Sequence, residues 1–143
     1  MADTQALVFF YGSYMNRAVL AEVDLVPGRW SKASLSGFGI RIAPRANLVR
    51  GADEMVFGVL ASAKHEELDR LYAHAERVLG EQYLPEAVLV QTDEGAFLPA
   101  LCYIAPNMVE RPAELAYVER IVKPARELGF PVWYLARLES FRP

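Results

Sequence analysis

One short stretch near the amino terminus most constrains the fold of this chain. Residues 6–11 read Ala-Leu-Val-Phe-Phe-Tyr, a nearly continuous apolar run with β-branched and aromatic members. Such a run is typical of a strand that is buried on both faces. It breaks at Gly12-Ser13, and Asn16 then suits the N-cap of a helix over residues 17–23. The sequence therefore predicts a central strand that turns sharply into a short helix.

The remaining residues predict a mixed order of strands and helices. Apolar spacing, turn residues and helix-ending residues divide them as follows: a strand at 30–42 with a bulge or close backbone approach at Gly37 and Gly39, a polar loop at 44–54, a strand at 55–61, a helix capped by Ser62 and ended by Gly80, a hairpin of 83–91 and 96–104, a helix at 113–128 containing Pro124, and a short apolar segment at 132–138. This order, with its antiparallel hairpin, predicts an α+β fold. At 143 residues we expect a single domain over residues 1–143.

Composition narrows the class of protein. With 53% hydrophobic and 23% charged residues and no long uncharged apolar stretch, the chain is expected to be neither disordered nor membrane-spanning. The first residues lack the basic segment of a signal peptide, so a cytoplasmic protein is expected. A formal charge of −3 without a Lys/Arg block argues against nucleic-acid binding. Arg41, Arg45 and Arg50 are interpreted as a solvated edge.

Cysteine and histidine usage gives no indication of a metal site. Cys102 is the single cysteine, so an internal disulfide and a cysteine-based zinc cluster are excluded, and its apolar surroundings suit a small buried side chain. His65 and His74 are nine residues apart, which is not the spacing of a helical metal pair. We expect no metal and no cofactor.

Two features suggest chemistry. A strand that ends in Gly-Ser places backbone N–H groups in one concavity, which can hold a carboxylate or a developing oxyanion. Glu76 follows Tyr72 and Ala75 on a mostly apolar stretch, and a partly buried glutamate there would have a raised pKa and could act as a general base. The alternative is an exposed helical glutamate paired with Arg77.

Short motifs occur in a fixed order along nearly the whole chain: Val8–Ser13, Ala33–Phe38, Val56–Leu60, Leu68-Asp69, Tyr83, Cys102–Ile104, Tyr117 with Ile121, and Leu128–Pro131 with Tyr134. In this order they resemble the γ-glutamylcyclotransferase-like family. The resemblance implies an α+β fold built on a small mixed or antiparallel β-barrel with flanking helices.

The resemblance also implies a reaction and a site. It implies a γ-glutamyl(amine or amino acid) cyclotransferase, an acyltransferase of the kind found in glutathione metabolism, which releases 5-oxoproline from a small γ-glutamyl substrate with one glutamate as acid and base. The implied substrate-binding residues are Tyr11, Gly12, Ser13, Tyr14, Tyr103 and Tyr117. The leaving amine is left open, as is the choice between a monomer and a homodimer.

Two positions depart from the family pattern. Tyr14 stands where the family has asparagine, and Tyr72 stands where the catalytic glutamate normally follows Leu-Asp. Counted back from Tyr83, the family spacing reaches Glu76, and an insertion of about one helical turn reconciles the two counts. Glu76 is therefore the expected base, with Glu81 in reserve. The alternatives are a non-catalytic ligand-binding or regulatory domain of the same fold and different chemistry on another γ-glutamyl carrier.

Overall fold

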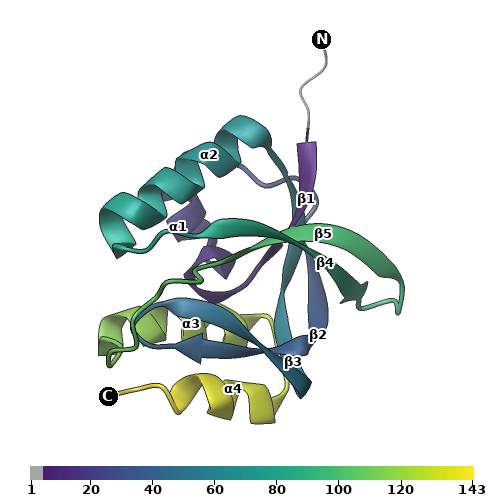
Figure 1. Cartoon of the computed structure of the whole chain (residues 1–143). Helices are drawn as coiled ribbons and strands as arrows, with labels where there is room; N and C mark the ends of the chain where they lie inside the picture. The colour runs from purple at the N-terminus through teal and green to yellow at the C-terminus, as the bar shows by residue number, and fades with distance from the viewer. Residues whose placement is uncertain (1–4) are drawn as a thin grey trace.

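Five strands close into a barrel in the computed structural model, which describes residues 5–143 (Figure 1). They are β1 (Gln5–Phe10), β2 (Ser31–Ile42), β3 (Ala46–Lys64), β4 (Leu84–Thr92) and β5 (Phe97–Ile104). Their order around the barrel is β1-β3-β2-β4-β5, with β1 and β5 parallel and the other recorded pairs antiparallel. The predicted α+β class with a small mixed barrel is confirmed, as is the β4–β5 hairpin.

The turn after β1 forms as the sequence predicts. The last three residues of β1 are buried, and a 3-10 turn, η1 (Gly12–Met15), leads into helix α1 (Arg17–Glu22). The Asn16 side chain accepts a hydrogen bond from the Ala18 N–H at 3.0 Å, so it caps α1 as expected. The buried end of β1 therefore leads directly into a buried turn.

The expectation of a polar loop at 44–54 is wrong. β3 begins at Ala46 and pairs with β2 from Ile42↔Ala46 onward, so the two strands form one long hairpin. Most side chains of residues 49–54 are exposed, and Arg41 donates to Glu54 across the pair at 3.1 Å. Polar side chains are compatible with a strand here because this end of the hairpin reaches solvent. The predicted bulge is present, since the register shifts at Gly37, which has φ +86°.

Helix α2 (His65–His74) continues into a π-helical turn, η2 (Ala75–Leu79), which ends at Gly80 in the left-handed conformation. The predicted helix is therefore present, but Ser62 does not cap it because β3 runs on to Lys64. Glu67 holds the start of α2 instead. Its carboxylate accepts the Lys64 N–H at 2.8 Å and the Val26 N–H at 2.9 Å.

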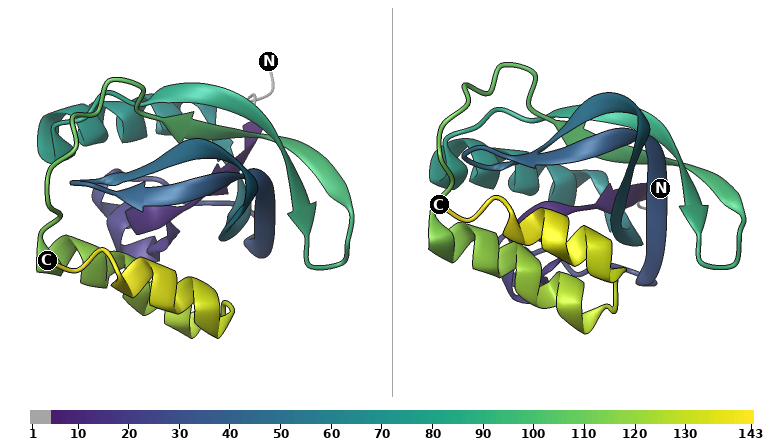
Figure 2. Two further views of the ribbon diagram at one scale, coloured as in Figure 1. Left: turned by 60° about the horizontal axis from the view of Figure 1, so that its bottom comes forward. Right: turned by 90° about the horizontal axis from the view of Figure 1, so that it is seen from below.

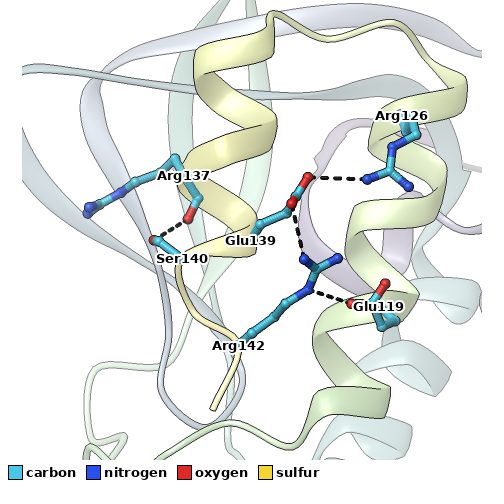
Figure 3. A network of polar contacts seen from close by, with 6 residues as sticks. All are labelled: Glu119, Arg126, Arg137, Glu139, Ser140 and Arg142. Atoms are coloured by element: carbon cyan, nitrogen blue, oxygen red, sulfur yellow. Dashed lines mark hydrogen bonds and ion pairs between the residues drawn. The ribbon is translucent and has the colours of Figure 1, made fainter.

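Helices α3 (Leu115–Glu127) and α4 (Val132–Glu139) lie side by side against the barrel (Figure 2). Ion pairs join their exposed faces, with Arg142 between Glu119 at 2.6 Å and Glu139 at 3.1 Å, and Arg126 on Glu139 at 3.2 Å (Figure 3). The final apolar segment is thus a helix. Over residues 5–143, none of the helices combines the length and apolar character needed to cross a membrane.

Candidate active site

Five buried tyrosines gather where β1 passes into η1. They come from five different segments and are Tyr11, Tyr14, Tyr83, Tyr103 and Tyr117. The Tyr11 and Tyr103 rings stack with centroids 4.6 Å apart, and the rings of Tyr14 and Tyr83 each meet Tyr103 edge-on at 5.7 Å. The structure therefore brings together the tyrosines that the sequence assigns to substrate binding, and it adds Tyr83.

Hydrogen bonds between Tyr103 and Tyr11 fix the end of β1. The Tyr103 hydroxyl accepts the Tyr11 N–H at 2.9 Å and donates to the Tyr11 carbonyl at 2.7 Å. The Tyr11 hydroxyl in turn donates to the Tyr103 carbonyl. Because both polar backbone groups of Tyr11 are bound by a side chain from β5, the chain is positioned just before the Gly12-Ser13 turn.

The first residue of β3 packs against the same turn. The Ala46 N–H donates to the Tyr117 hydroxyl at 2.9 Å, and the Ala46 carbonyl accepts from Tyr83 at 2.5 Å. Ser13 is also hydrogen-bonded to Tyr117. Gly12 has φ +68°, and a Cβ there would lie 2.5 Å from the Cβ of Ala46. Glycine is therefore required at position 12 both by the left-handed backbone and by the approach of β3.

The η1 turn presents backbone donors. The N–H groups of Gly12 and Ser13 precede the first i→i+3 hydrogen bond of the 3-10 turn, so they have no acceptor within it. Within residues 5–143 these two groups also make no recorded hydrogen bond outside the turn. The turn can therefore offer N–H donors to a carboxylate or an oxyanion.

The phenols of the cluster stay protonated near neutral pH. Burial raises the pKa of Tyr11, Tyr83 and Tyr103 well above the ordinary value, and neighbouring tyrosines add to the effect for each. Burial also raises the pKa of Tyr72 to about 12. These side chains can donate protons in hydrogen bonds, but they cannot serve as the base.

His74 belongs to the cluster. The sequence indicated only that His74 does not form a helical metal pair with His65. Its side chain is buried, and Nδ1 lies 3.1 Å from the Tyr14 hydroxyl. Burial lowers the pKa of this imidazole, which favours the neutral ring. Tyr14 thus has a hydrogen-bond partner on α2, and no sequence pattern predicted that contact.

The expected partial burial of Glu76 is corrected by the structure. Its side chain is exposed, because the η2 turn buries Ala75 and directs the next residues toward solvent. Glu81 follows after Gly80 has reversed the chain, and it is only 9% exposed. Its backbone N–H donates to the Ala75 carbonyl at 3.2 Å, and its charge helps to raise the pKa of Tyr83.

Glu81 differs from the other buried acidic residue, Glu67, in the hydrogen-bond partners of its carboxylate. The two Glu67 oxygens accept backbone N–H groups at the start of α2. In the described part of the chain, the Glu81 carboxylate takes part in neither a recorded hydrogen bond nor an ion pair. Because no fully buried side-chain oxygen in residues 5–143 lacks a partner, the unbonded Glu81 oxygens keep contact with solvent and are open to a substrate.

A surface cavity of about 350 Å³ lies next to the cluster, and Arg45, which lines it, contacts Tyr117. The Arg45 guanidinium lies 4.7 Å from the centre of the Tyr117 ring, and its Nε donates to the Leu79 carbonyl at 3.2 Å. The cavity is lined by Pro44, Arg45, Leu79, Arg111, Pro112 and Glu114.

Across residues 5–143, no three His, Cys, Asp or Glu side chains are grouped so that they could hold a metal ion.

Comparison with known families identifies the family to which the chain belongs. A model of the AIG2-like family matches residues 55–138, more than half of its length. The chain belongs to the AIG2-like family. A comparison with curated proteins finds no match.

Solved structures share the fold of this AIG2-like chain. A structure described as a gamma-glutamyl cyclotransferase superposes with a TM-score of 0.81 at 22% identity, covering 98% of this chain and 89% of the other. An uncharacterized human protein gives 0.80 at 24% identity, with 97% and 89% covered. A yeast gamma-glutamyl cyclotransferase specific to glutathione gives 0.67 at 12% identity, with 97% and 96% covered. The γ-glutamylcyclotransferase-like fold is thereby confirmed.

Proposed function

We propose that this AIG2-like protein is a γ-glutamyl cyclotransferase that releases 5-oxoproline, with Glu81 as the proton carrier. Family membership and fold favour chemistry of the cyclotransferase type. The observation that carries the proposal is Glu81, a largely buried residue whose carboxylate has no recorded partner and whose charge acts on Tyr83 in the cluster of protonated phenols. A carboxylate that is not tied up in a structural hydrogen bond is available to carry a proton in general acid–base catalysis.

The proposed reaction requires one bond exchange and one relayed proton. The α-amine of the γ-glutamyl group attacks its own γ-carbonyl carbon, and the new C–N bond closes a five-membered ring as the original amide C–N bond breaks. Glu81 accepts the proton lost by the attacking amine and delivers it to the leaving nitrogen. Because the nucleophile is part of the substrate, the protein mainly has to fold that substrate correctly.

The η1 turn would stabilise negative charge in this reaction. The N–H groups of Gly12 and Ser13 would bind the glutamyl α-carboxylate or the tetrahedral oxyanion. Tyr11, Tyr103 and Tyr117 would act mainly by holding this turn in place, since their hydroxyls already bind one another's backbone, Ala46 or Ser13. The substrate would enter beside Arg45, which lines the cavity and lies over the Tyr117 ring.

A panel of γ-glutamyl amino acids and γ-glutamyl amines tests this function. The purified full chain should release 5-oxoproline and the free amine in equal amounts from at least one compound. Glu81→Gln should be inactive on that compound while keeping the wild-type circular dichroism spectrum. If the wild-type protein releases 5-oxoproline from none of the compounds, the proposal is contradicted.

A non-catalytic ligand-binding or regulatory domain is the second candidate. It is favoured by the internal bonding of the tyrosine hydroxyls and by Tyr14, which is bonded to His74. In that case calorimetry should show saturable binding of a γ-glutamyl compound without any release of 5-oxoproline. Turnover of the bound compound would exclude this second candidate.

A further inference from the structure

The cavity beside the tyrosine cluster carries two arginines and one acidic residue. Arg45 comes from the turn between β2 and β3, and Arg111 and Glu114 come from the segment before α3. Leu79, from the end of η2, forms another wall. The charged lining residues give the cavity a formal net positive charge, and a volume of about 350 Å³ is within the usual size of a small-ligand site.

Arg45 is held in one orientation while part of its guanidinium stays available. Nε donates to the Leu79 carbonyl at 3.2 Å, and the guanidinium lies over the Tyr117 ring. These contacts leave the two terminal nitrogens without a recorded acceptor in residues 5–143. A guanidinium stacked on an aromatic ring is pre-organised to bind a carboxylate with its remaining donors.

Arg111 adds a second positive charge that is likewise not neutralised. Its backbone N–H donates to the Ala43 carbonyl at 3.4 Å, which ties its segment to the β2–β3 turn that carries Arg45. Neither arginine forms an ion pair within the described chain, whereas Arg41, Arg120 and Arg142 are each paired with a glutamate. Glu114, on the same cavity, is not within ion-pair distance of either.

The cavity is also placed next to the proposed reaction centre. Tyr117 contacts Arg45 on one side and is hydrogen-bonded to Ser13 and to the Ala46 N–H on the other. Glu81 and Arg45 both act electrostatically on Tyr83, with opposite effects on the pKa of that phenol. A substrate whose glutamyl half lies at the turn would therefore extend its leaving half toward Arg45 and Arg111.

We propose that Arg45 and Arg111 form a subsite that binds a carboxylate on the leaving half of the substrate and thereby select substrates by charge. This inference rests on the proposed cyclotransferase function. It assigns a specificity role to two residues outside the tyrosine cluster. Leaving groups with a carboxylate are preferred over uncharged amides of the same size, and cationic leaving groups are disfavoured.

Matched substrates measure this preference directly. γ-Glutamyl-glycine and γ-glutamyl-glycinamide differ only in the terminal charge, so kcat/KM for 5-oxoproline release should be about tenfold to hundredfold higher for the acid, the range expected for hydrogen bonds to a charged group. Arg111→Gln should remove most of this preference by raising KM for the acid, with the amide unaffected. Arg45→Gln should act in the same direction, and Arg50→Gln, a distant exposed arginine, should leave the preference unchanged.

A binding experiment separates failure of the subsite from failure of the enzyme function. Acetylglycine and acetylglycinamide are titrated into the full chain while the arginine Nε–H resonances are followed by NMR. Selective shifts at Arg45 and Arg111 with acetylglycine alone support the subsite even if no 5-oxoproline is ever formed. Equal turnover of the two matched substrates, or the absence of selective shifts with acetylglycine, overturns it.

Discussion

The Tyr103 hydroxyl binds both polar backbone groups of Tyr11, accepting its N–H at 2.9 Å and donating to its carbonyl at 2.7 Å. A side chain of β5 thus completes the hydrogen bonding of β1 at the residue where the Gly-Ser turn begins. The two rings also stack with centroids 4.6 Å apart. Tyr103 is consequently a positioning residue for the turn rather than a residue that lines open space.

Tyr103→Phe should destabilise the protein by about 2–4 kcal/mol, because two buried backbone groups lose their partner. Urea unfolding followed by circular dichroism measures the effect. Tyr134→Phe is the matched control, since that hydroxyl is buried but its bond to the Phe57 carbonyl is long, at 3.5 Å. Equal losses for the two variants would contradict the special role of the Tyr103 hydroxyl.

Gly12→Ala should be more damaging than Gly80→Ala. Both glycines have positive φ, +68° and +76°, so both substitutions carry the left-handed backbone penalty of about 1–2 kcal/mol. Only at position 12 would the new methyl also meet Ala46, at 2.5 Å, whereas nothing lies within 4 Å at position 80. We expect an additional loss of about 1–3 kcal/mol for Gly12→Ala from overpacking, measured as the difference between the two unfolding free energies.

Stability should fall as the pH drops through about 6.5, the ordinary pKa of histidine. Burial lowers the pKa of His74 in the folded state, so below pH 6.5 the unfolded chain binds a proton that the folded chain does not. The loss should level off below the folded pKa. Glu22 opposes the lowering, and Arg77 and Arg120 reinforce it.

Urea unfolding at several pH values between 5 and 8 tests this linkage. His74→Gln keeps a polar partner for Tyr14 and should flatten the pH dependence in this range. His65→Gln is the matched control, because it removes an exposed histidine from the same helix. An unchanged slope in His74→Gln would show that another group is responsible.

A helix cap, a bulge and a helix end were predicted correctly from the residues next to them in the sequence. Asn16 caps α1, Gly37 marks the bulge in β2, and Gly80 ends the helical segment, because each depends on the conformation of a few neighbouring residues. The strand over 46–54 was missed because its polar side chains read as a loop. Its partners are supplied by β2, with Glu54 held by Arg41, and that pairing is not visible in the segment itself.

The candidate site was predicted in its composition but not in its geometry. The tyrosines and the Gly-Ser turn meet as expected, yet the buried carboxylate is Glu81 rather than Glu76. Sequence counting cannot distinguish the two, since the choice depends on a π-helical turn followed by a left-handed glycine, which reverses the chain before Glu81. The contact between Tyr14 and His74 depends equally on tertiary packing across sixty residues.

The catalytic assignment is tested most directly by comparing kcat for Glu81→Gln and Glu76→Gln on the best γ-glutamyl substrate. Both replacements preserve side-chain shape and remove the base, so they differ only in location. We predict that Glu81→Gln lowers kcat roughly hundredfold to ten-thousand-fold, the usual contribution of a general acid–base group, while Glu76→Gln stays within about twofold of the wild type, as expected for an exposed residue away from the site. Full activity in Glu81→Gln, or a large loss confined to Glu76→Gln, would contradict this account.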